Sequence, residues 1–459
     1  MKDKHYPVVI LGAGVTGLTL AHLLNKKGVD FKVLETRPRA GGVINTQCEK
    51  GFVCESGPNS GIVSHPEVVA LFDDLGEAIK VEKGNDLVKV RYVLKKGRWH
   101  ALPQGPLSAI ATPLFSLKDK FRILAEPFRK KGTNPDETLE QLVLRRMGKS
   151  FLDYAIDPFI LGIYAGDPAR LVTRHALPKL YNLEQKYGSF IGGSIKKAKE
   201  PKTELEKRTD RAVFSIEGGL SGLTKALLES AGKEHFSFGV DGVRIQPSAE
   251  GFFVEYQEEG QQYSIHADRV ITTFGAVGLE STLPFIAPAN MKALTNLKYA
   301  RVVEVSLGFD AWNGRPLDGF GGLIPHKEGR NMLGVLFMSS LFRDRAPDGG
   351  ALLTIFMGGV RNESFCELDD AAIMKVLEQE FSELMELPTF KPTLVKIKRY
   401  AHAIPQYEVN SGERFAAIDR VQKEYPGLII AGNLRDGIGM ADRIKQATHI
   451  AKEITSCES

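Results

Sequence analysis

The chain has 459 residues, more than one hydrophobic core usually holds, and this length predicts two or three domains. Hydrophobic residues make up 43% and charged residues 25%, which is ordinary for a soluble globular protein and excludes global disorder. The net charge of +4 is too small to indicate a nucleic acid partner. The four cysteines, Cys48, Cys54, Cys366 and Cys457, show no C-x-x-C spacing, so they predict neither a disulfide framework nor a metal site.

The N-terminus leads directly into an apolar strand at 8–11, which leaves no room for a cleaved leader. No apolar run is long enough to span a bilayer. We therefore expect a cytoplasmic protein whose contact with a membrane is peripheral, on the inner face of the cytoplasmic membrane.

The strand at 8–11 runs into a glycine-rich turn and an amphipathic helix. Gly12 allows the tight turn, Gly14 lets a pyrophosphate approach the backbone, and Gly17 lets the helix pack close to the strand. The N-terminus of the helix offers free N–H groups and a partial positive charge to phosphates. This context predicts a dinucleotide-binding unit.

A second strand at 31–34 ends at Glu35, whose carboxylate can accept hydrogen bonds from both ribose hydroxyls. The residues that follow include Arg39, Gly41 and Gly42. This stretch resembles the Glu-x-x-x-Arg-x-Gly-Gly extension of FAD enzymes in the amine oxidase, phytoene desaturase and protoporphyrinogen oxidase superfamily. The resemblance implies that Arg39 contacts the FAD diphosphate and that the two glycines let the loop cross close to the cofactor.

Cations gather between residues 95 and 199. They include Lys95, Lys96, Arg98, Arg129, Lys130, Lys131, Arg145, Arg146, Lys149, Lys196, Lys197 and Lys199. The same segment holds an apolar, helix-poor stretch at 106–117 and a basic helix at 118–124. Apolar residues beside cations suit an anionic membrane surface, whereas a core hairpin with a solvated basic face fits equally well. Nucleic acid binding is disfavoured because no recognition module accompanies the charges.

Further elements follow in chain order. The pattern predicts a helix over 137–156, an exposed loop over 196–211, a helix after Leu220, and strands at 251–256 and 269–273. Near the C-terminus a buried strand at 428–431 precedes a glycine-containing loop and a helix over 443–454. This second strand-loop-helix can again present N–H groups to an anion.

The superfamily resemblance extends to this C-terminal block. It implies that Gly432, Gly439, Met440 and Asp442 contact the cofactor, with Asp442 reaching the ribityl or phosphate region and Asp436 a weaker candidate. It also implies cofactor contacts from Gly57 and Val243. The FAD-binding domain is then discontinuous.

Five blocks spread over the chain are similar to the oxygen-dependent protoporphyrinogen oxidase family: residues 157–168, 183–193, 320–325, 333–347 and 403–407. The resemblance implies noncovalent FAD and oxidation of protoporphyrinogen IX to protoporphyrin IX, with oxygen as acceptor and hydrogen peroxide as product. No catalytic side chain is expected, because the flavin carries the electron chemistry.

Substrate contacts follow from the same resemblance. Arg91 lies where the family has an arginine that pairs with a propionate, a task that suits the bidentate guanidinium. Asn59 lies in the loop that approaches the flavin from the substrate side, although turn formation explains it equally well. The backbone of Gly162 is expected over the macrocycle. Leu323, Phe337 and Met338 are expected to form pocket walls, or to be ordinary core residues.

We therefore expect an α/β (α+β overall) protein with a Rossmann-like FAD-binding domain made of residues 1–80, 212–280 and 420–459. A mixed-sheet substrate domain is expected over 281–419, with parts of 81–92 and 196–211, and a helical membrane-associating insertion over 93–195. Oxidation of coproporphyrinogen III, a flavin amine oxidase, a carotenoid desaturase and a non-enzymatic FAD scaffold are the alternatives. A homodimer and a downstream chelatase partner are left open.

Overall fold

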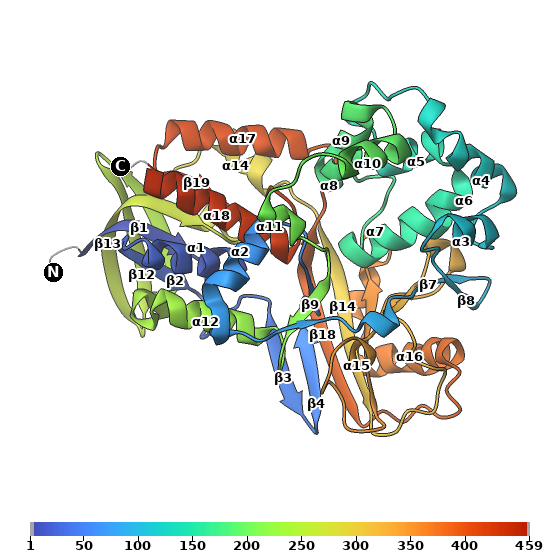
Figure 1. Cartoon of the computed structure of the whole chain (residues 1–459). Helices are drawn as coiled ribbons and strands as arrows, with labels where there is room; N and C mark the ends of the chain where they lie inside the picture. Colours follow the sequence, from blue (N-terminus) through green and yellow to red (C-terminus); the bar gives the residue numbers. More distant parts are fainter. Residues whose placement is uncertain (1–3, 457–459) are drawn as a thin grey trace.

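Two mixed β-sheets organise residues 4–456, the part of the chain that the computed structural model describes (Figure 1). Residues 1–3 and 457–459 lie outside it. The expectations for the first three residues and for Cys457 therefore fall outside the described residues. The mixed α/β fold class is confirmed.

The first sheet has the order β10-β2-β1-β13-β12-β11, with β19 beside β13. Its strands are β1 (Lys4–Leu11), β2 (Phe31–Glu35), β10 (Phe236–Phe238), β11 (Asp241–Ser248), β12 (Gly251–Glu258), β13 (Gln261–Thr272) and β19 (Leu428–Ile430). Its centre is parallel, because β1 pairs in parallel with both β2 and β13, and β19 extends the same pattern. The apolar runs in β1 and β19 fit strands that are buried on both faces.

Helices cover both faces of this sheet. α1 (Val15–Lys26) packs between α12 (Ser221–Ala231) and α18 (Met440–Ser456), and α2 (Pro66–Leu75) lies against α18. The opposite face is covered by α14 (Pro288–Thr295) and α17 (Ser411–Glu424), which pack against each other. Figure 1 shows the N-terminal blue strands beside the red C-terminal helix. The layer therefore joins segments from the start, middle and end of the chain.

The second sheet has the order β18-β14-β17-β16-β15-β7-β8. Its strands are β7 (Arg91–Lys95), β8 (Arg98–Ala101), β14 (Tyr299–Phe309), β15 (Gly321–Leu323), β16 (Met332–Phe337), β17 (Ala351–Gly358) and β18 (Leu394–Pro405). Only β15 and β7 pair in parallel. α16 (Asp370–Met385) covers one face through an apolar core.

The other face of the second sheet is called the inner face below. Strand alternation brings onto it Arg91, Leu323, Leu336, Thr354, Phe356, Glu304 and Tyr400. α7 (Asp157–Tyr164) lies against it, because Leu161 packs with Val302 and Phe356. The loop that carries Asn59 also lies against it.

Smaller elements complete the fold. Two small sheets are formed by β3 (Asn45–Glu49) with β4 (Phe52–Ser56), and by β5 (Gly61–Ile62), β9 (Val213–Ile216) and β6 (Val81–Lys83). The remaining helices are α3 (Pro106–Ala111), α4 (Leu117–Leu124), α5 (Leu139–Arg146), α6 (Lys149–Phe151), α8 (Thr173–Ala176), α9 (Pro178–Tyr187), α10 (Phe190–Ala198), α11 (Glu204–Lys207), α13 (Leu279–Thr282) and α15 (Met338–Leu341). Short turns of 3₁₀ helix lie at Gly76–Ala78, Asp86–Val88, Glu126–Phe128, Lys233–His235, His326–Glu328 and Glu363–Glu367, and a π-helical turn lies at Leu152–Ile156.

The structure corrects several predicted elements. The helix expected over 137–156 is interrupted at Gly148, whose φ of +99° is a conformation that ends a helix. The stretch at 106–117, expected to be helix-poor, contains α3. The segment 196–211 is largely exposed as expected but contains α11 and the end of α10. The last helix starts at Met440, earlier than expected.

Within residues 4–456, none of the helices has the length and hydrophobicity needed to cross a membrane.

Candidate functional site

The glycine-rich turn after β1 has the geometry that its sequence predicts. Gly12 has a φ of +106°, and its N–H donates to the carbonyl of Leu34 at 2.8 Å. A Cβ on Gly17 would lie 1.9 Å from the carbonyl oxygen of Gly12, so only glycine lets the helix approach the strand this closely. Thr273 fixes the same turn, because its hydroxyl donates to the carbonyls of Leu11 and Gly12.

Gly14 differs from Gly12 and Gly17 because there is open space where its side chain would lie. A Cβ on Gly14 would meet no heavy atom within 4 Å, whereas a Cβ on Gly42 would lie 3.1 Å from the Cα of Gly14. Gly14 is also the N-cap residue of α1, and no side chain caps this helix. The first N–H groups of α1 therefore face a space bounded by Gly42, which suits a pyrophosphate.

Glu35 lies at the end of β2, beside the glycine turn. Its carboxylate accepts hydrogen bonds from the N–H of Ala13 at 2.7 Å and from the N–H of Arg37 at 2.8 Å. The carboxylate is therefore fixed in place, and it keeps further lone pairs for ribose hydroxyls. Val240 donates to the carbonyl of Glu35, which brings the bulged start of β11, with Val243, next to this end of β2.

Arg39 makes contacts that the sequence did not predict. Its guanidinium donates to the carbonyls of Ala40, Gly42 and Ile44 at 2.9–3.0 Å. Burial lowers the pKa of Arg39 from its usual value. In this arrangement Arg39 shapes the Gly41–Gly42 loop, where Gly41 has a φ of +102° and Gly42 of +58°.

The C-terminal block packs against the same turn. A Cβ on Gly432 would lie 2.9 Å from the carbonyl oxygen of Thr273. The hydroxyl of the same threonine donates a hydrogen bond to the carbonyl of Gly12. The side chain of Asn433 is partly buried, and its Oδ1 has no hydrogen-bond partner among residues 4–456. The buried Arg443 donates to the carbonyl of Gly432 and, at 2.9 Å, to that of Gly437. The loop ahead of α18 is therefore held next to the glycine-rich turn.

Asp442 is bound to the protein on both carboxylate oxygens. It lies 3.0 Å from Nε2 of His65 and accepts the N–H of Gly439 at 3.0 Å, next to Met440 at the start of α18. Burial opposes ionisation, but the hydrogen bonds from His65 and Gly439 lower the pKa of Asp442 below its usual range. His65 was assigned no such role from the sequence, because 377 residues separate it from Asp442.

These residues fit a dinucleotide cofactor. The open space at Gly14 and the unpartnered Oδ1 of Asn433 are features that a bound group would complete. The Gly12–Gly17 turn, the Arg39-braced loop and the Gly432 loop would hold it.

Asn59 lies on the inner face in a hydrogen-bond network. Its amide Nδ2 donates to Oε1 of Glu304 at 2.6 Å, and its Oδ1 accepts from the hydroxyl of Thr354 at 2.9 Å. Gly57 has a φ of +87°, and its N–H donates to Oε2 of Glu304 at 2.9 Å. Gly57 also packs against Val43, directly after the Gly41–Gly42 loop. The Asn59 loop thus links the cofactor loop to the inner face.

Gly162 and Leu323 are close neighbours. A Cβ on Gly162 would lie 2.8 Å from Cδ2 of Leu323. Arg91 begins β7, is exposed, and is the register partner of Gly321 on β15. Its guanidinium lies 5.0 Å from the centre of the Phe320 ring, and it forms no ion pair with another of residues 4–456. Arg91 is therefore an exposed cation at the border of the inner face, stacked on Phe320 and without an ion-pair partner in the described part of the chain.

Phe337 and Met338 lie in core clusters, which is the second of the two placements that the sequence left open. Phe337 is 1% exposed and packs in the core beneath α16, on the opposite face of the sheet from Leu323. Met338 is also buried, in a cluster with Phe52 and Leu352. These placements do not favour the predicted role of either residue as a pocket wall. Leu336 points to the inner face instead.

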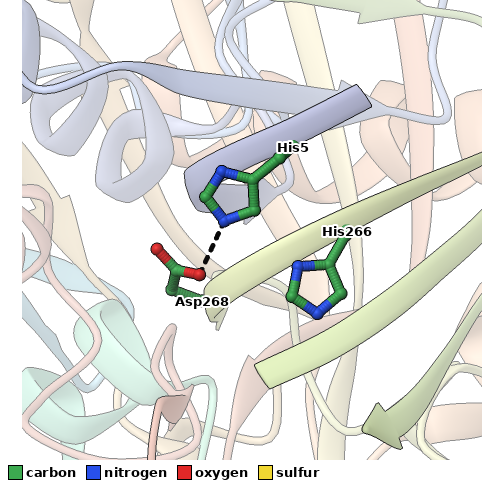
Figure 2. Close-up of side chains that lie close together, drawn as sticks. All are labelled: His5, His266 and Asp268. Atoms are coloured by element: carbon green, nitrogen blue, oxygen red, sulfur yellow. Dashed lines mark hydrogen bonds and ion pairs between the residues drawn. The ribbon is translucent and has the colours of Figure 1, made fainter. Parts of the chain in front are cut away.

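A cluster of two histidines and an aspartate lies at the far end of the first sheet (Figure 2). Nε2 of His5 lies 2.7 Å from Oδ1 of Asp268, and the ring of His5 stacks on that of His266. His266 Nε2 is 3.1 Å from the hydroxyl of Ser248. The cluster lies at the start of β1, whereas the glycine-rich turn follows its end. The cluster links β1 to β13, and we assign it no part in the candidate site.

Comparison with known proteins identifies the class. The model of the flavin containing amine oxidoreductase family matches residues 15–454. The chain belongs to this family and is a flavin-dependent oxidoreductase.

Within this family, the chain resembles porphyrinogen-oxidising enzymes over nearly its whole length, as expected from its motifs. It is 29% identical to protoporphyrinogen oxidase 2 of Arabidopsis thaliana, covering 98% of this chain and 95% of the relative. It is 27% identical to the coproporphyrinogen III oxidase of Bacillus subtilis, covering 97% of each chain. A crystal structure from Exiguobacterium sp. 255-15, provisionally described as a protoporphyrinogen oxidase, has a TM-score of 0.81 at 23% identity and full coverage of both chains, which confirms the fold.

Proposed function

We propose that this protein uses noncovalent FAD to oxidise protoporphyrinogen IX to protoporphyrin IX. Three oxygen molecules accept the six electrons and six protons of this reaction and leave as three molecules of hydrogen peroxide. The proposed sites are the glycine-rich turn, the Arg39-braced loop and the Gly432 loop for FAD, and the inner face for the macrocycle.

One observation carries this proposal. The Asn59 loop contacts both the Gly41–Gly42 side of the molecule through Val43 and the inner face through Glu304 and Thr354. A cofactor bound along the first region would therefore end beside the second. The curated relatives that share the whole length of the chain are named as enzymes that oxidise porphyrinogens.

The residues of the chain supply binding and orientation. A bound flavin would supply the redox chemistry between the porphyrinogen and oxygen. Leu323 and the backbone of Gly162 offer an apolar, close-fitting surface for a flat macrocycle. The exposed guanidinium of Arg91 offers a bidentate partner for a propionate at the border. Holding one bridge carbon in a reactive position lowers the entropic part of the barrier.

Anaerobic reduction of the purified, flavin-loaded chain tests the proposal. Protoporphyrinogen IX should bleach the flavin absorbance without oxygen, and admission of air should restore the absorbance and produce porphyrin fluorescence. Coproporphyrinogen III and a primary amine serve as competing substrates in the same assay. Faster bleaching by coproporphyrinogen III, bleaching by the amine alone, or no bleaching by any of them would each overturn the proposal.

We also propose that the chain docks on an anionic lipid surface through the segment from α3 to Phe128. Large apolar side chains in this segment project into solvent. They are Leu107, Ile110, Leu117, Phe121, Leu124 and Phe128, with exposed fractions of 63–90%. Among the residues of the segment whose burial is described, only Leu114 and Phe115 are buried apolar residues, which disfavours the core hairpin. Lys118 and Lys130 lie exposed among these side chains and would face lipid phosphates.

The basic character of this region is weaker than the sequence suggested. Arg146 is fully buried and forms ion pairs with Glu126 and Glu184, and Arg145 pairs with Glu137 and Glu184. These two cations hold the helices together and are not available to lipid. Apolar insertion therefore contributes a larger share of the proposed docking.

A further inference from the structure

A buried carboxyl group on the inner face holds the Asn59 loop. Glu304 is 3% exposed and accepts three hydrogen bonds: from Gly57 N–H, from the hydroxyl of Tyr400 at 2.9 Å, and from Nδ2 of Asn59. Among residues 4–456, no lysine, arginine or histidine forms an ion pair with it. A carboxylate in this position is satisfied by neutral donors only, so it lacks the counter-charge that a buried ion usually has.

The partners of Asn59 allow two orientations of its amide. In the structure the nitrogen faces Glu304 and the oxygen faces Thr354. An ionised Glu304 can only accept, so it requires this orientation. A protonated Glu304 can donate to an amide oxygen, and the hydroxyl of Thr354 can accept from an amide N–H, so these two partners would also satisfy the turned amide. The turned amide would lose only the long hydrogen bond that Nδ2 donates to the carbonyl of Gly57 at 3.3 Å. Ionisation of Glu304 therefore fixes the orientation of Asn59, whereas protonation of Glu304 allows both orientations.

We propose that Glu304 is a positioning residue that, when ionised, turns the amide of Asn59 so that its oxygen keeps a lone pair free for a pyrrole N–H of the substrate. This inference rests on the proposed function, which assigns the Asn59 loop to the substrate side of the flavin. A porphyrinogen presents pyrrole N–H donors, so an acceptor at Asn59 suits the reduced substrate.

Charged and titratable groups around Glu304 set the pH at which Glu304 ionises and the Asn59 amide changes orientation. Burial, with a smaller contribution from the charge of Glu55 on β4, raises the pKa of Glu304 to about 7, against the hydrogen bonds from the Asn59 loop and Tyr400. On β18, Tyr400 faces it and the exposed Lys398 is its register partner. Arg39 lies near Tyr400 on the cofactor side. The amide is therefore expected to turn within the range that an enzyme assay covers.

The test compares the flavin-loaded wild type with Glu304→Gln between pH 6 and pH 9. The glutamine keeps the size of the side chain but cannot ionise. We expect wild-type kcat/KM for protoporphyrinogen IX to rise with ionisation near neutral pH. We expect Glu304→Gln to lose this rise, to keep its FAD, and to have a KM raised by up to about tenfold, as for loss of one hydrogen bond between the neutral Asn59 amide and a pyrrole N–H. Thr354→Val, which leaves the carboxyl group intact, should keep the rise.

Infrared difference spectra between pH 6 and pH 8.5 give a readout that does not depend on turnover. A protonated carboxyl band should titrate in the wild type, shift in Asn59→Ala and be absent in Glu304→Gln. Absence of a titrating band, or a wild-type pH profile in Glu304→Gln, would overturn the inference. A pH-independent loss of activity together with loss of FAD would mean a structural role and would overturn it as well. Failure of the wild type to oxidise any porphyrinogen would overturn the proposed function and the substrate role of Asn59, while the infrared band still decides the coupling to Glu304.

Discussion

Gly42 lies directly against Gly14, so that a Cβ on Gly42 would be 3.1 Å from the Cα of Gly14. The two glycines belong to different motifs, the turn after β1 and the loop after β2. Their contact closes one side of the space in front of α1, and Arg39 holds the loop there through the Gly42 carbonyl. The region proposed for the cofactor phosphates is therefore enclosed by two loops.

The open space at Gly14 makes one substitution a clean probe of flavin binding. Gly14→Val would fill the region proposed for the pyrophosphate without striking another protein atom with its Cβ. We expect a folded protein that has lost its yellow colour, measured as the ratio of flavin to protein absorbance. Gly17→Ala is the contrasting variant, because its Cβ would strike the Gly12 carbonyl at 1.9 Å and should lower stability as well. Normal flavin content in folded Gly14→Val would contradict the assignment.

Local motifs account for what the sequence predicted well. Three features depend only on residues that are close in the chain, so the spacing of these residues predicts them. They are the turn at Gly12–Gly17, the end of β2 at Glu35 and the C-terminal strand with the glycines that follow it. The break at Gly148 had a readable signal too, a glycine inside a helical pattern.

Long-range partners account for what the sequence did not predict. Glu304 lies within an apolar strand, and its partner Asn59 is 245 residues away, so no local pattern reveals their bond. Phe337 belongs to a block that resembles the family, but the alternation of β16 brings its neighbour Leu336 onto the face of Leu323. Once the pairing register of the strands is known, it shows that Leu336, and not Phe337, shares a face with Leu323.

The exposed apolar segment predicts binding to anionic vesicles. Phe128 is 90% exposed, and Phe128→Ser should reduce sedimentation with phosphatidylglycerol vesicles about tenfold, since burying a phenylalanine contributes about 1.5–3 kcal/mol. Val409→Ser, which alters a 70% exposed residue outside the segment, serves as the matched control and should change nothing. High salt should weaken binding only in part, because screening acts on the cations and not on apolar insertion. Equal sedimentation of Phe128→Ser and wild type would reject the docking surface.

The buried carboxyl group of Glu304 predicts a pH dependence of stability. Its pKa of about 7 in the folded chain exceeds the value of about 4.3 for an exposed glutamate. The folded state therefore holds the proton more tightly, and this contribution to stability is complete below about pH 4 and is lost as the pH rises through 7. The loss amounts to about 4 kcal/mol, because each pKa unit corresponds to about 1.4 kcal/mol.

Denaturant unfolding from pH 5 to pH 8 measures this contribution. The difference in unfolding free energy between wild type and Glu304→Gln should move in favour of the variant as the pH rises. Tyr400→Phe removes a donor to the carboxylate and should shift the change to higher pH. Parallel pH curves for the wild type and Glu304→Gln would show that Glu304 does not titrate in this range.

The exposed guanidinium of Arg91 gives the most direct test of substrate binding. If it pairs with a propionate, Arg91→Ala should keep FAD and lower kcat/KM for the porphyrinogen by roughly ten to a hundredfold, since a hydrogen bond to a charged group contributes about 1.5–3 kcal/mol. Arg91→Lys should recover only part of this loss, because an ammonium cannot reproduce the bidentate fork. Because Arg91 has no ion-pair partner among residues 4–456, its removal leaves no carboxylate of the described chain unpaired. A loss confined to KM would mean uniform binding of substrate and transition state, whereas a loss in kcat would mean that the contact also aligns the bridge carbon with the flavin. Steady-state oxidation followed by porphyrin fluorescence distinguishes these cases. Unchanged kinetics in Arg91→Ala would mean that Arg91 is a solvated surface residue that does not bind the substrate.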